Sequence, residues 1–304
     1  MNTASKTRHV FILFLADIVW GIAFVAQSKG GDAVGAFSFN GIRFIIGALC
    51  LLDKKELTVN RPESKKQKKE LWIAGSCCGI ALFFASNLQQ LGISMGAESG
   101  KAGFLTATYI LMVPILGIFL KRKCGVKIWI GVFIALIGMY FLCMNGTFSL
   151  SGSDLLLLAG ALCFAIQILV IDHFVSHVDA VRLSCIEFFV TGLGSCIVMI
   201  FTDMGPSTGG IAQWAQSLCT WDAWIPILYA GIFSSGVGYT LQIVGQKGLN
   251  PAVASVAMSL ESVVSVIAGW ILLDQMLGGR EIFGCVLMFI AIIIAQLPDR
   301  EYTK

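Results

Sequence analysis

The chain has 304 residues, of which 57% are apolar and 13% are charged, and its formal net charge is +3. Soluble domains carry about 25% charged residues, so this composition excludes an ordinary soluble protein and is typical of a membrane protein. A net charge this small is weak evidence for nucleic acid binding, and where the basic residues lie along the chain matters more than their sum.

The apolar residues form ten runs whose lengths suit membrane-spanning helices. A helix needs about 20 residues to cross the roughly 30 Å of hydrocarbon in a bilayer, whereas the strands of a membrane β-barrel alternate apolar and polar residues. The first run is longer than a signal-peptide core and no small-residue cleavage pattern follows it, so we expect a retained anchor. We predict an all-α membrane protein with ten transmembrane helices. In chain order they lie near residues 10–28, 34–52, 71–94, 101–120, 127–144, 154–173, 181–202, 223–246, 251–273 and 282–297.

The basic residues fall mainly on one side of the predicted membrane. Ten crossings place both termini on the same side, and the loops of that side include RPESKKQKKE at residues 61–70. The opposite side has only Lys29, Lys101 and Arg280. Because cytoplasmic loops carry an excess of Lys and Arg, we expect both termini to be cytoplasmic, in the cell membrane of a bacterium. The loop 61–70 would also suit lipid or nucleic acid, but a topology signal is the simpler interpretation.

The second half of the chain resembles the first. The segment IRFIIGAL at residues 42–49 returns as IEFFVTGL at residues 186–193, and Gln90 with the ESG that follows it corresponds to Gln242 with the NPA that follows it. These matches are weak one by one, but they occur in the same order. Internal repeats of this size are found in many transporters.

We therefore divide the chain into an N-terminal five-helix repeat at residues 1–148 and a C-terminal five-helix repeat at residues 149–304. Because five is an odd number, the second repeat enters the membrane from the opposite side, which makes the two an inverted repeat. Inverted halves can exchange shapes with respect to the two sides of a membrane, which is the physical basis of alternating access around a central site.

Four segments carry a resemblance to a known family. They are VWGIAFVAQ at residues 19–27, GIRFIIGALCLL at 41–52, ESGKAGFLTATYILMVPIL at 98–116 and NPAVASVAMSLESVVSVIAGWILL at 250–273. With them the chain resembles, over nearly its whole length, the drug/metabolite transporter superfamily and in particular its EamA-like ten-helix carriers. The resemblance implies a multi-pass carrier of small metabolites, often amino acids and often exported.

Three positions depart from the pattern of that family. Ser262 stands where proline is usual, Asp274 stands where a glutamate often ends the helix, and Asp17 stands where a small apolar residue is commoner. The motifs therefore specify the family and say little about the substrate.

Asp17 is a carboxylate within the first apolar run, where an ionised side chain costs about 2.5–3.5 kcal/mol. Arg43 in the second run lies at a similar depth, so one interpretation is a buried structural ion pair. The other is a proton-coupling site, because LADIVWG at residues 15–21 is also similar to the first helix of small multidrug resistance proteins, in which a glutamate at an equivalent place exchanges protons for substrate. The two interpretations partly exclude each other, since a neighbouring cation holds a carboxylate ionised.

Polar residues within other runs are candidates for a substrate site. Two stripes of them recur at helical spacing in the third and eighth runs, which correspond in the repeat. The stripes are Asn87, Gln90 and Ser94 in the third run, and Ser235, Tyr239, Gln242 and Gln246 in the eighth. Interhelical hydrogen bonding would explain any single one, but two corresponding stripes favour a wet cavity. With aromatic walls and one deep carboxylate added, the candidate substrate-binding residues are Trp20, Asn87, Gln90, Tyr109, Gln167, Tyr239, Gln242 and Glu261.

The sequence also supports predictions for two further carboxylates and one proline. Glu187, the repeat counterpart of Arg43, is expected to be hydrated near a helix end. Glu261 either lines the pathway or hydrogen-bonds a neighbouring helix. Pro114 should interrupt the hydrogen-bond ladder of the fourth run and kink it.

No motif indicates an enzyme, a cofactor or a metal site. ESGKA resembles the end of a phosphate-binding loop but lacks the first glycine of that loop and its final Ser or Thr. The ten cysteines contain no CxxC pair, and the three histidines supply no nucleophile–base set or metal cluster. We expect no cofactor, no metal and no nucleic acid partner. The expected partners are a small-molecule solute, protons and the lipid bilayer, with the protein a monomer or a homodimer.

The sequence as a whole predicts a secondary active transporter that exports amino acids or similar small metabolites across the cytoplasmic membrane by alternating access, with proton coupling through Asp17 as a hypothesis. A rival within the class is an exporter of hydrophobic or cationic drugs or of lipid-linked precursors. A rival from another class is a non-transporting membrane scaffold or receptor.

Overall fold

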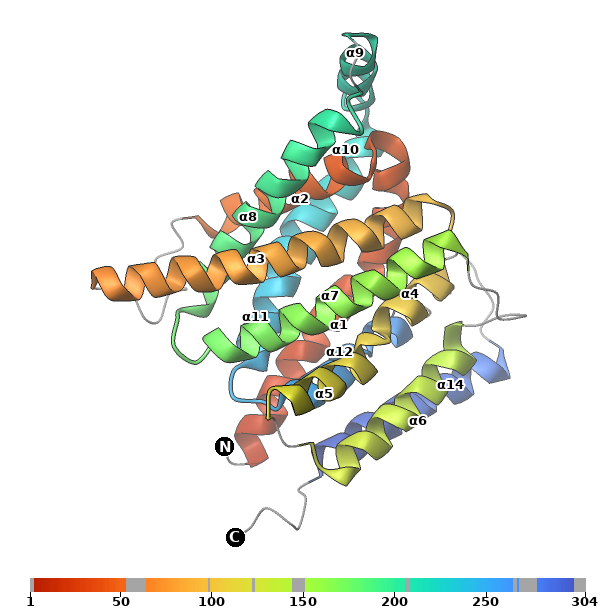
Figure 1. The fold of residues 1–304 in the computed structure, drawn as a ribbon. Coiled ribbons are helices and arrows are strands. Elements are labelled where there is room, and N and C mark those ends of the chain that lie inside the picture. Colours follow the sequence, from red (N-terminus) through yellow and green to blue (C-terminus); the bar gives the residue numbers. More distant parts are fainter. Residues whose placement is uncertain are drawn as a thin grey trace.

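The computed structural model describes residues 3–52, 64–97, 99–121, 124–143, 151–205, 208–264, 267 and 278–297. All regular secondary structure in these ranges is helical, and Figure 1 shows the arrangement. The helices are α1 (Thr3–Val34), α2 (Ala36–Leu51), α3 (Lys65–Ser94), α4 (Ser99–Ala107), α5 (Tyr109–Phe119), α6 (Val126–Cys143), α7 (Gly152–Phe174), α8 (Ala180–Phe201), α9 (Thr208–Ser217), α10 (Trp221–Leu228), the π-helix η1 (Tyr229–Tyr239), α11 (Thr240–Gln246), α12 (Pro251–Met258) and α14 (Gly279–Gln296).

Within the described ranges, six helical segments are long and apolar enough to span a membrane, and the predicted all-α membrane fold is confirmed. Helices occur in each of the ten predicted ranges. Residues 265–266 and 268–273 of the ninth range, and Asp274 after it, lie outside the described residues. The six segments are Lys6–Val34, Lys65–Ser94, Ala102–Phe119, Gly152–Phe174, Ala180–Phe201 and Trp221–Gln246.

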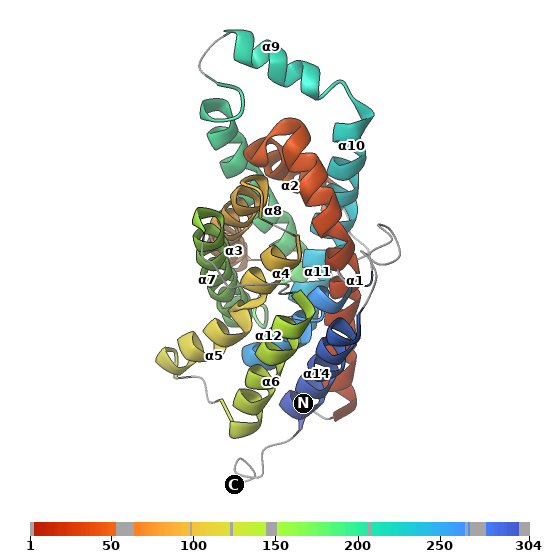
Figure 2. The same ribbon diagram turned by 90° about the vertical axis from the view of Figure 1, so that its right-hand side faces the viewer.

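The beginning of α1 and the end of α14 lie at the same end of the molecule, and α9 lies at the opposite end (Figures 1 and 2). No sequence pattern predicted α9, which lies in the long loop expected between the seventh and eighth runs. Trp214 of α9 donates from Nε1 to Ser38 Oγ at 2.9 Å, and Asp203 accepts from the Ser38 backbone N–H at 2.6 Å. These bonds attach the loop to the first turn of α2.

Close glycine contacts show that three pairs of neighbouring helices run antiparallel. On α2 and α8, Gly41 lies against Cys196 and Gly192 lies against Ile45. On α6 and α14, which lie side by side in Figure 1, Gly131 lies against Ala291 and Gly138 against Gly284. On α3 and α7, Gly92 lies against Leu157 and Gly160 against Ala85. Small residues allow this close approach where lipid supplies no hydrophobic driving force.

The fourth predicted helix is interrupted at Thr108, between α4 and α5, and not at Pro114, which lies within α5. This break was not predicted, and the kink at Pro114 stays a prediction. Thr108 Oγ1 donates to the carbonyl of Leu105 at 2.5 Å, and the Thr108 backbone N–H donates to the same carbonyl at 3.3 Å. A hydroxyl that bonds the carbonyl three residues earlier competes with the α-helical ladder.

The ninth predicted helix has a similar interruption. α12 ends at Met258, a turn covers Ser259 and Leu260, and helical structure resumes at Glu261. Ser259 Oγ donates to the carbonyl of Val256 at 2.7 Å, which repeats the arrangement at Thr108. Backbone groups freed in this way inside a membrane must face protein or a wet cavity, since lipid cannot satisfy them.

The eighth predicted helix is not α-helical throughout, because the 11 residues of η1 lie between α10 and α11. A π-helix has a wider turn than an α-helix and is frequent at functional sites. Tyr229 at its start donates to the carbonyl of Val19 at 3.0 Å, and Gly231 lies against Ile46 of α2. These contacts place the wide turns of η1 between α1 and α2.

Candidate functional site

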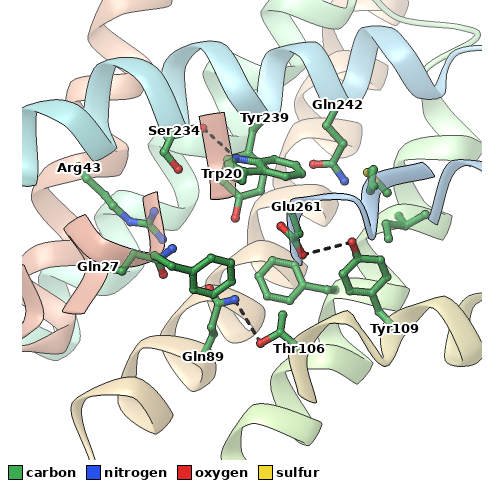
Figure 3. Close-up of a pocket in the computed structure, with 14 residues that line it drawn as sticks. Trp20, Gln27, Arg43, Gln89, Thr106, Tyr109, Ser234, Tyr239, Gln242 and Glu261 are labelled. Carbon is green, nitrogen blue, oxygen red and sulfur yellow. Dashed lines mark hydrogen bonds between the residues drawn. The ribbon is translucent and has the colours of Figure 1, made fainter. Parts of the chain in front are cut away.

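A cavity lies among helices from both halves of the chain. The first half contributes residues of α1 to α5, and the second half contributes residues of α7, η1, α11 and the segment from α12 to Glu261. Figure 3 shows how the side chains converge. The lining residues are Trp20, Phe24, Gln27, Arg43, Gln89, Thr106, Tyr109, Phe164, Ile168, Ser234, Tyr239, Gln242, Met258 and Glu261.

Arg43 supplies a buried cation to the cavity and is only 1% exposed. Its Nε donates to Asn40 Oδ1 at 2.8 Å, and the guanidinium lies 4.5 Å from the centre of the Phe44 ring. Its Nη2 has no hydrogen-bond partner among the described residues. Such a buried donor is costly to leave unsatisfied, so this side of the cavity favours a ligand with an acceptor.

Glu261 supplies the opposite charge and is 7% exposed. It is held by Tyr109, whose hydroxyl donates to Glu261 Oε1 over 3.4 Å. In Figure 3 the Glu261–Tyr109 pair lies across the cavity from Arg43. Within the described part of the chain, neither Arg43 nor Glu261 has an ion-pair partner.

Aromatic rings form one wall of the cavity. The rings of Trp20 and Tyr239 are 4.9 Å apart, and Tyr239 also contacts Phe44 at 5.8 Å. Trp20 Nε1 donates to the backbone oxygen of Ser234 in η1 at 3.2 Å, which fixes the indole against the π-helix. The wall offers a flat apolar surface beside the two charged groups.

Five of the eight predicted substrate-binding residues line the cavity, and three do not. Trp20, Tyr109, Tyr239, Gln242 and Glu261 line it. The other three face neighbouring helices. Asn87 donates to Ser195 Oγ at 2.8 Å, Gln90 donates to the carbonyl of Gln27 at 2.8 Å, and Gln167 donates to Glu187 Oε1 at 2.8 Å.

Asp17 does not line the cavity and does not pair with Arg43. Its side chain is fully buried, and neither of its carboxylate oxygens has a hydrogen-bond partner among the described residues. The structural ion pair considered from the sequence is therefore absent from this structure, although both residues are buried as expected.

Glu187 is fully buried, so the expectation of a hydrated side chain is wrong. It lies about two turns inside α8, which packs against α2 and α3, and Gln167 of α7 donates to its Oε1. Position along the helix did not reveal this, because neighbouring helices decide which side chains near a helix end reach water.

The sequence reasoning missed eight lining residues, four of them polar: Gln27, Gln89, Thr106 and Ser234. Gln27 could have been found, since it lies seven residues after Trp20 and therefore on the same face of α1. Gln89 could not have been found, because the surrounding sequence does not distinguish it from Gln90, whose side chain donates to the carbonyl of Gln27.

A multi-pass helical membrane protein with a polar cavity between its helices, two of them interrupted beside that cavity, has the general design of a membrane transporter. The comparisons with known proteins place the chain more narrowly. It belongs to the EamA-like transporter family, whose model matches residues 7–144 and residues 151–296.

Similar proteins carry transporter names. An uncharacterized transporter of Archaeoglobus fulgidus is 27% identical over 297 residues, covering 94% of this chain and 84% of that protein. The uncharacterized transporter YoaV of Bacillus subtilis is 22% identical over 281 residues, covering 89% of this chain and 90% of that protein. A solved crystal structure matches with a TM-score of 0.75 at 18% identity, covering 98% of this chain and 99% of the other, and shows a shared fold.

Proposed function

We propose that this membrane transporter is a secondary carrier that exports amino acids, or small metabolites with the same zwitterionic group, across the cytoplasmic membrane. The cavity is its substrate site, and it opens to the two sides in turn. The observation that carries this proposal is the pair of interrupted helices, because their breaks bring Tyr109 and Glu261 together in the cavity. Transporters commonly build midplane sites from discontinuous helices in corresponding places of two repeats.

The two breaks correspond under the repeat proposed from the sequence. Tyr109 and Glu261 are separated along the chain by the same number of residues as Gln90 and Gln242, the pair that first suggested the repeat. Each follows a hydroxyl-bearing turn, at Thr108 in one case and Ser259 in the other. This agreement supports ten crossings in two five-helix halves, at residues 1–148 and 149–304.

The contacts between halves support an inverted relation. The repeat-related helices α2 and α8 run antiparallel, as do the repeat-related helices α6 and α14. The same relation connects Gly79, against the backbone oxygen of Glu187, with Gly231, against that of Arg43. A parallel repeat would make each related pair point the same way. The family model also matches the chain in two segments of similar length.

The charges of the cavity support a zwitterionic cargo. Arg43 presents a guanidinium donor without a partner, and such a group binds carboxylates well. Glu261 presents a carboxylate that suits an ammonium group. Because the two charges do not pair with each other, a free amino acid would supply the missing partner of each, and its side chain would lie against Trp20 and Tyr239.

We further propose that Asp17 binds and releases a proton during transport. A fully buried carboxylate without a hydrogen-bond partner is favoured in its neutral form and is a functional suspect by default within a membrane. Asp17→Asn should abolish accumulation driven by a pH gradient yet preserve substrate exchange. Unchanged gradient-driven transport would rule out the coupling role. Loss of folding that Arg43→Gln restores would instead favour an ion pair formed in another conformation.

The direction of insertion is part of the same proposal. Basic residues are concentrated on the side of both termini, which we propose is cytoplasmic. α9, at the opposite end in Figure 1, would then lie outside the cell membrane. The side on which α9 lies can be measured by placing single cysteines in α9 and treating intact cells with an impermeant thiol reagent. Failure of the reagent to label them would reverse the assignment.

Counterflow in proteoliposomes tests the function. Vesicles loaded with one unlabelled amino acid should take up the same radiolabelled amino acid transiently, and Arg43→Gln and Glu261→Gln should each remove this uptake. Gly103→Ala is the matched control, because a Cβ at this helical position meets no atom within 4 Å. The panel includes aromatic cations, since an aromatic wall beside a carboxylate also suits them. No flux of any solute would favour the scaffold or receptor alternative.

A further inference from the structure

A chain of three buried polar side chains leads away from the cavity to α8. Gln242 on α11 donates from Nε2 to Gln167 Oε1 at 3.1 Å, and Gln167 on α7 donates from Nε2 to Glu187 Oε1 at 2.8 Å. Gln167 and Glu187 are fully buried, and Gln242 is 3% exposed. Only Gln242 of the three lines the cavity, so the other two residues act on a solute solely through it.

The direction of these hydrogen bonds follows from Glu187. An amide group can turn either its oxygen or its nitrogen toward a neighbour, whereas the Oε1 of Glu187 only accepts. Gln167 must therefore present Nε2 to Glu187, which leaves its oxygen facing Gln242. Gln242 must in turn present Nε2 to Gln167. The Oε1 of Gln242 then has no partner among the described residues.

An ionised Glu187 enforces this order, and a neutral Glu187 keeps it when its proton is bound to Oε2. Its second oxygen, Oε2, has no partner among the described residues, so a proton bound there leaves Oε1 an acceptor. Glu187 acts electrostatically on two titratable groups of neighbouring elements, Cys78 of α3 and Tyr239 of η1. Neither bonds the oxygen that Gln167 uses.

We propose that Glu187 and Gln167 are positioning residues that hold the Gln242 amide with its oxygen available to the cavity, and that this makes the site select solutes with a hydrogen-bond donor at that point. In Figure 3 the Gln242 side chain points into the cavity on the side of Glu261 and Tyr109. The amide oxygen and the Glu261 carboxylate together form an acceptor pair that suits an ammonium group. This inference rests on the proposed function and adds the reason for its selectivity.

Two variants test whether the direction of these hydrogen bonds matters, as distinct from their presence. Glu187→Gln keeps the size of the side chain but can donate or accept, so both directions of the chain become possible. The double variant Glu187→Gln with Gln167→Glu exchanges the two side chains. The carboxylate, now on α7, would accept from both neighbours, and Gln242 would again donate to it and keep its oxygen free. Ser184→Ala, a buried position one turn earlier on α8, is the control.

The first measurement needs no ligand. Glutamine side chains labelled with nitrogen-15 give amide signals in NMR spectra of the protein in micelles, and the Gln242 signal is identified by its absence in Gln242→Leu. We expect that signal to move in Glu187→Gln, to return in the double variant and to stay in place in Ser184→Ala. An unmoved Gln242 signal in folded Glu187→Gln would overturn the inference, whether or not the protein transports amino acids.

The second measurement compares L-norleucine with 2-hydroxyhexanoate, which replaces the ammonium group by a hydroxyl group. The preference for norleucine in counterflow should fall about tenfold in Glu187→Gln, as expected for one hydrogen bond to a charged group, and should recover in the double variant. An unchanged preference in both would overturn the selective role. If Glu187→Gln does not fold, loss of the preference in the double variant overturns it. If the NMR signals behave as expected and no amino acid is transported, the proposed function fails. The direction of the hydrogen bonds from Gln242 to Glu187 is then still supported.

Discussion

Two corresponding junctions of the molecule have similar packing and different chemistry. A Cβ at Gly79 of α3 would lie 2.8 Å from the backbone oxygen of Glu187, and one at Gly231 of η1 would lie 3.1 Å from that of Arg43. Yet the Arg43 side chain lines the cavity, whereas the Glu187 side chain turns to Gln167 outside it. Under the proposed repeat, the backbone contacts are shared by both halves, and the site depends on the residues in which the halves differ.

The same contrast holds for the helices that carry these glycines. α3 is α-helical over its whole length, while its proposed counterpart passes through η1 before α11. The stripe on α3 holds helices together, since Asn87 bonds Asn40 and Ser195. The stripe on η1 and α11 brings Tyr239 and Gln242 to the cavity. One helix supports the fold, and the other supplies the site.

The largest effect on transport is expected from neutralising Arg43, and a much smaller one from neutralising Glu187, its proposed counterpart in the second half. Arg43→Gln removes the donor proposed for the substrate carboxylate, so kcat/KM for amino acid counterflow should fall about 100-fold, mainly through KM. Glu187→Gln should change selectivity and lower kcat/KM by much less. Initial rates in proteoliposomes measure both. Equal losses would show that the two positions do not differ in role.

A smaller effect is expected on stability at the two glycine junctions. At Gly79 an added Cβ meets the rigid backbone oxygen of Glu187, so Gly79→Ala should lower the free energy of unfolding by about 1–3 kcal/mol. At Gly231 the corresponding backbone oxygen, that of Arg43, is farther away at 3.1 Å, so Gly231→Ala should lower it less. Unfolding in detergent, with Gly103→Ala as reference, gives the order. The reverse order would contradict the packing described for these junctions.

Substitution in the stripe on α3 should mainly lower stability, and substitution in the stripe on η1 and α11 should mainly raise KM. Asn87→Leu removes the hydrogen bonds to Asn40 and Ser195 and should lower the free energy of unfolding by about 1–2 kcal/mol, with KM unchanged in the folded protein. Gln242→Leu removes a single hydrogen bond, to Gln167, so it should lower stability less and should raise KM. Thermal unfolding and counterflow of the same preparations separate the effects. A raised KM in Asn87→Leu would place the first stripe in the site.

The smallest effect is expected at the contact between α1 and η1. Trp20→Phe keeps most of the aromatic wall and removes the hydrogen bond to the carbonyl of Ser234. Losing one neutral hydrogen bond corresponds to about a fivefold change, so KM should rise by about that factor. Trp20→Ala should raise KM further because the wall is lost. Identical KM values for the two variants would assign the whole effect to the hydrogen bond.

The sequence predicted the cavity residues whose position follows from helical period and depth. Tyr239 and Gln242, from the polar stripe of the eighth run, and Glu261, from its depth, are of this kind. Gln27 follows from the same rule, because it shares a face of α1 with Trp20. Gln90 was predicted in place of its neighbour Gln89, because a rotation of about 100° separates adjacent residues and sequence does not fix the rotation of a helix. Neighbouring helices fix it, and their arrangement is not visible in the sequence.

The interruptions of the helices were harder to predict. Pro114 suggested a kink, but the break lies at Thr108, where a hydroxyl bonds the carbonyl three residues earlier. Serine and threonine occur throughout these helices, so their presence alone does not locate a break. η1 has the same difficulty, since its glycines and serines also suit close α-helical packing. The part of the site that depends on broken or widened helices therefore required the structure.

Access to the cavity from each side of the membrane tests the central claim most directly. Gln27 lines the cavity and is 6% exposed, so a single cysteine at this position, in a variant lacking the native cysteines, reports whether an impermeant thiol reagent reaches the site. Alternating access predicts labelling in both right-side-out and inside-out vesicles, with the ratio of the two rates changed by a transported amino acid. Labelling from one side only, unchanged by any amino acid, would contradict it.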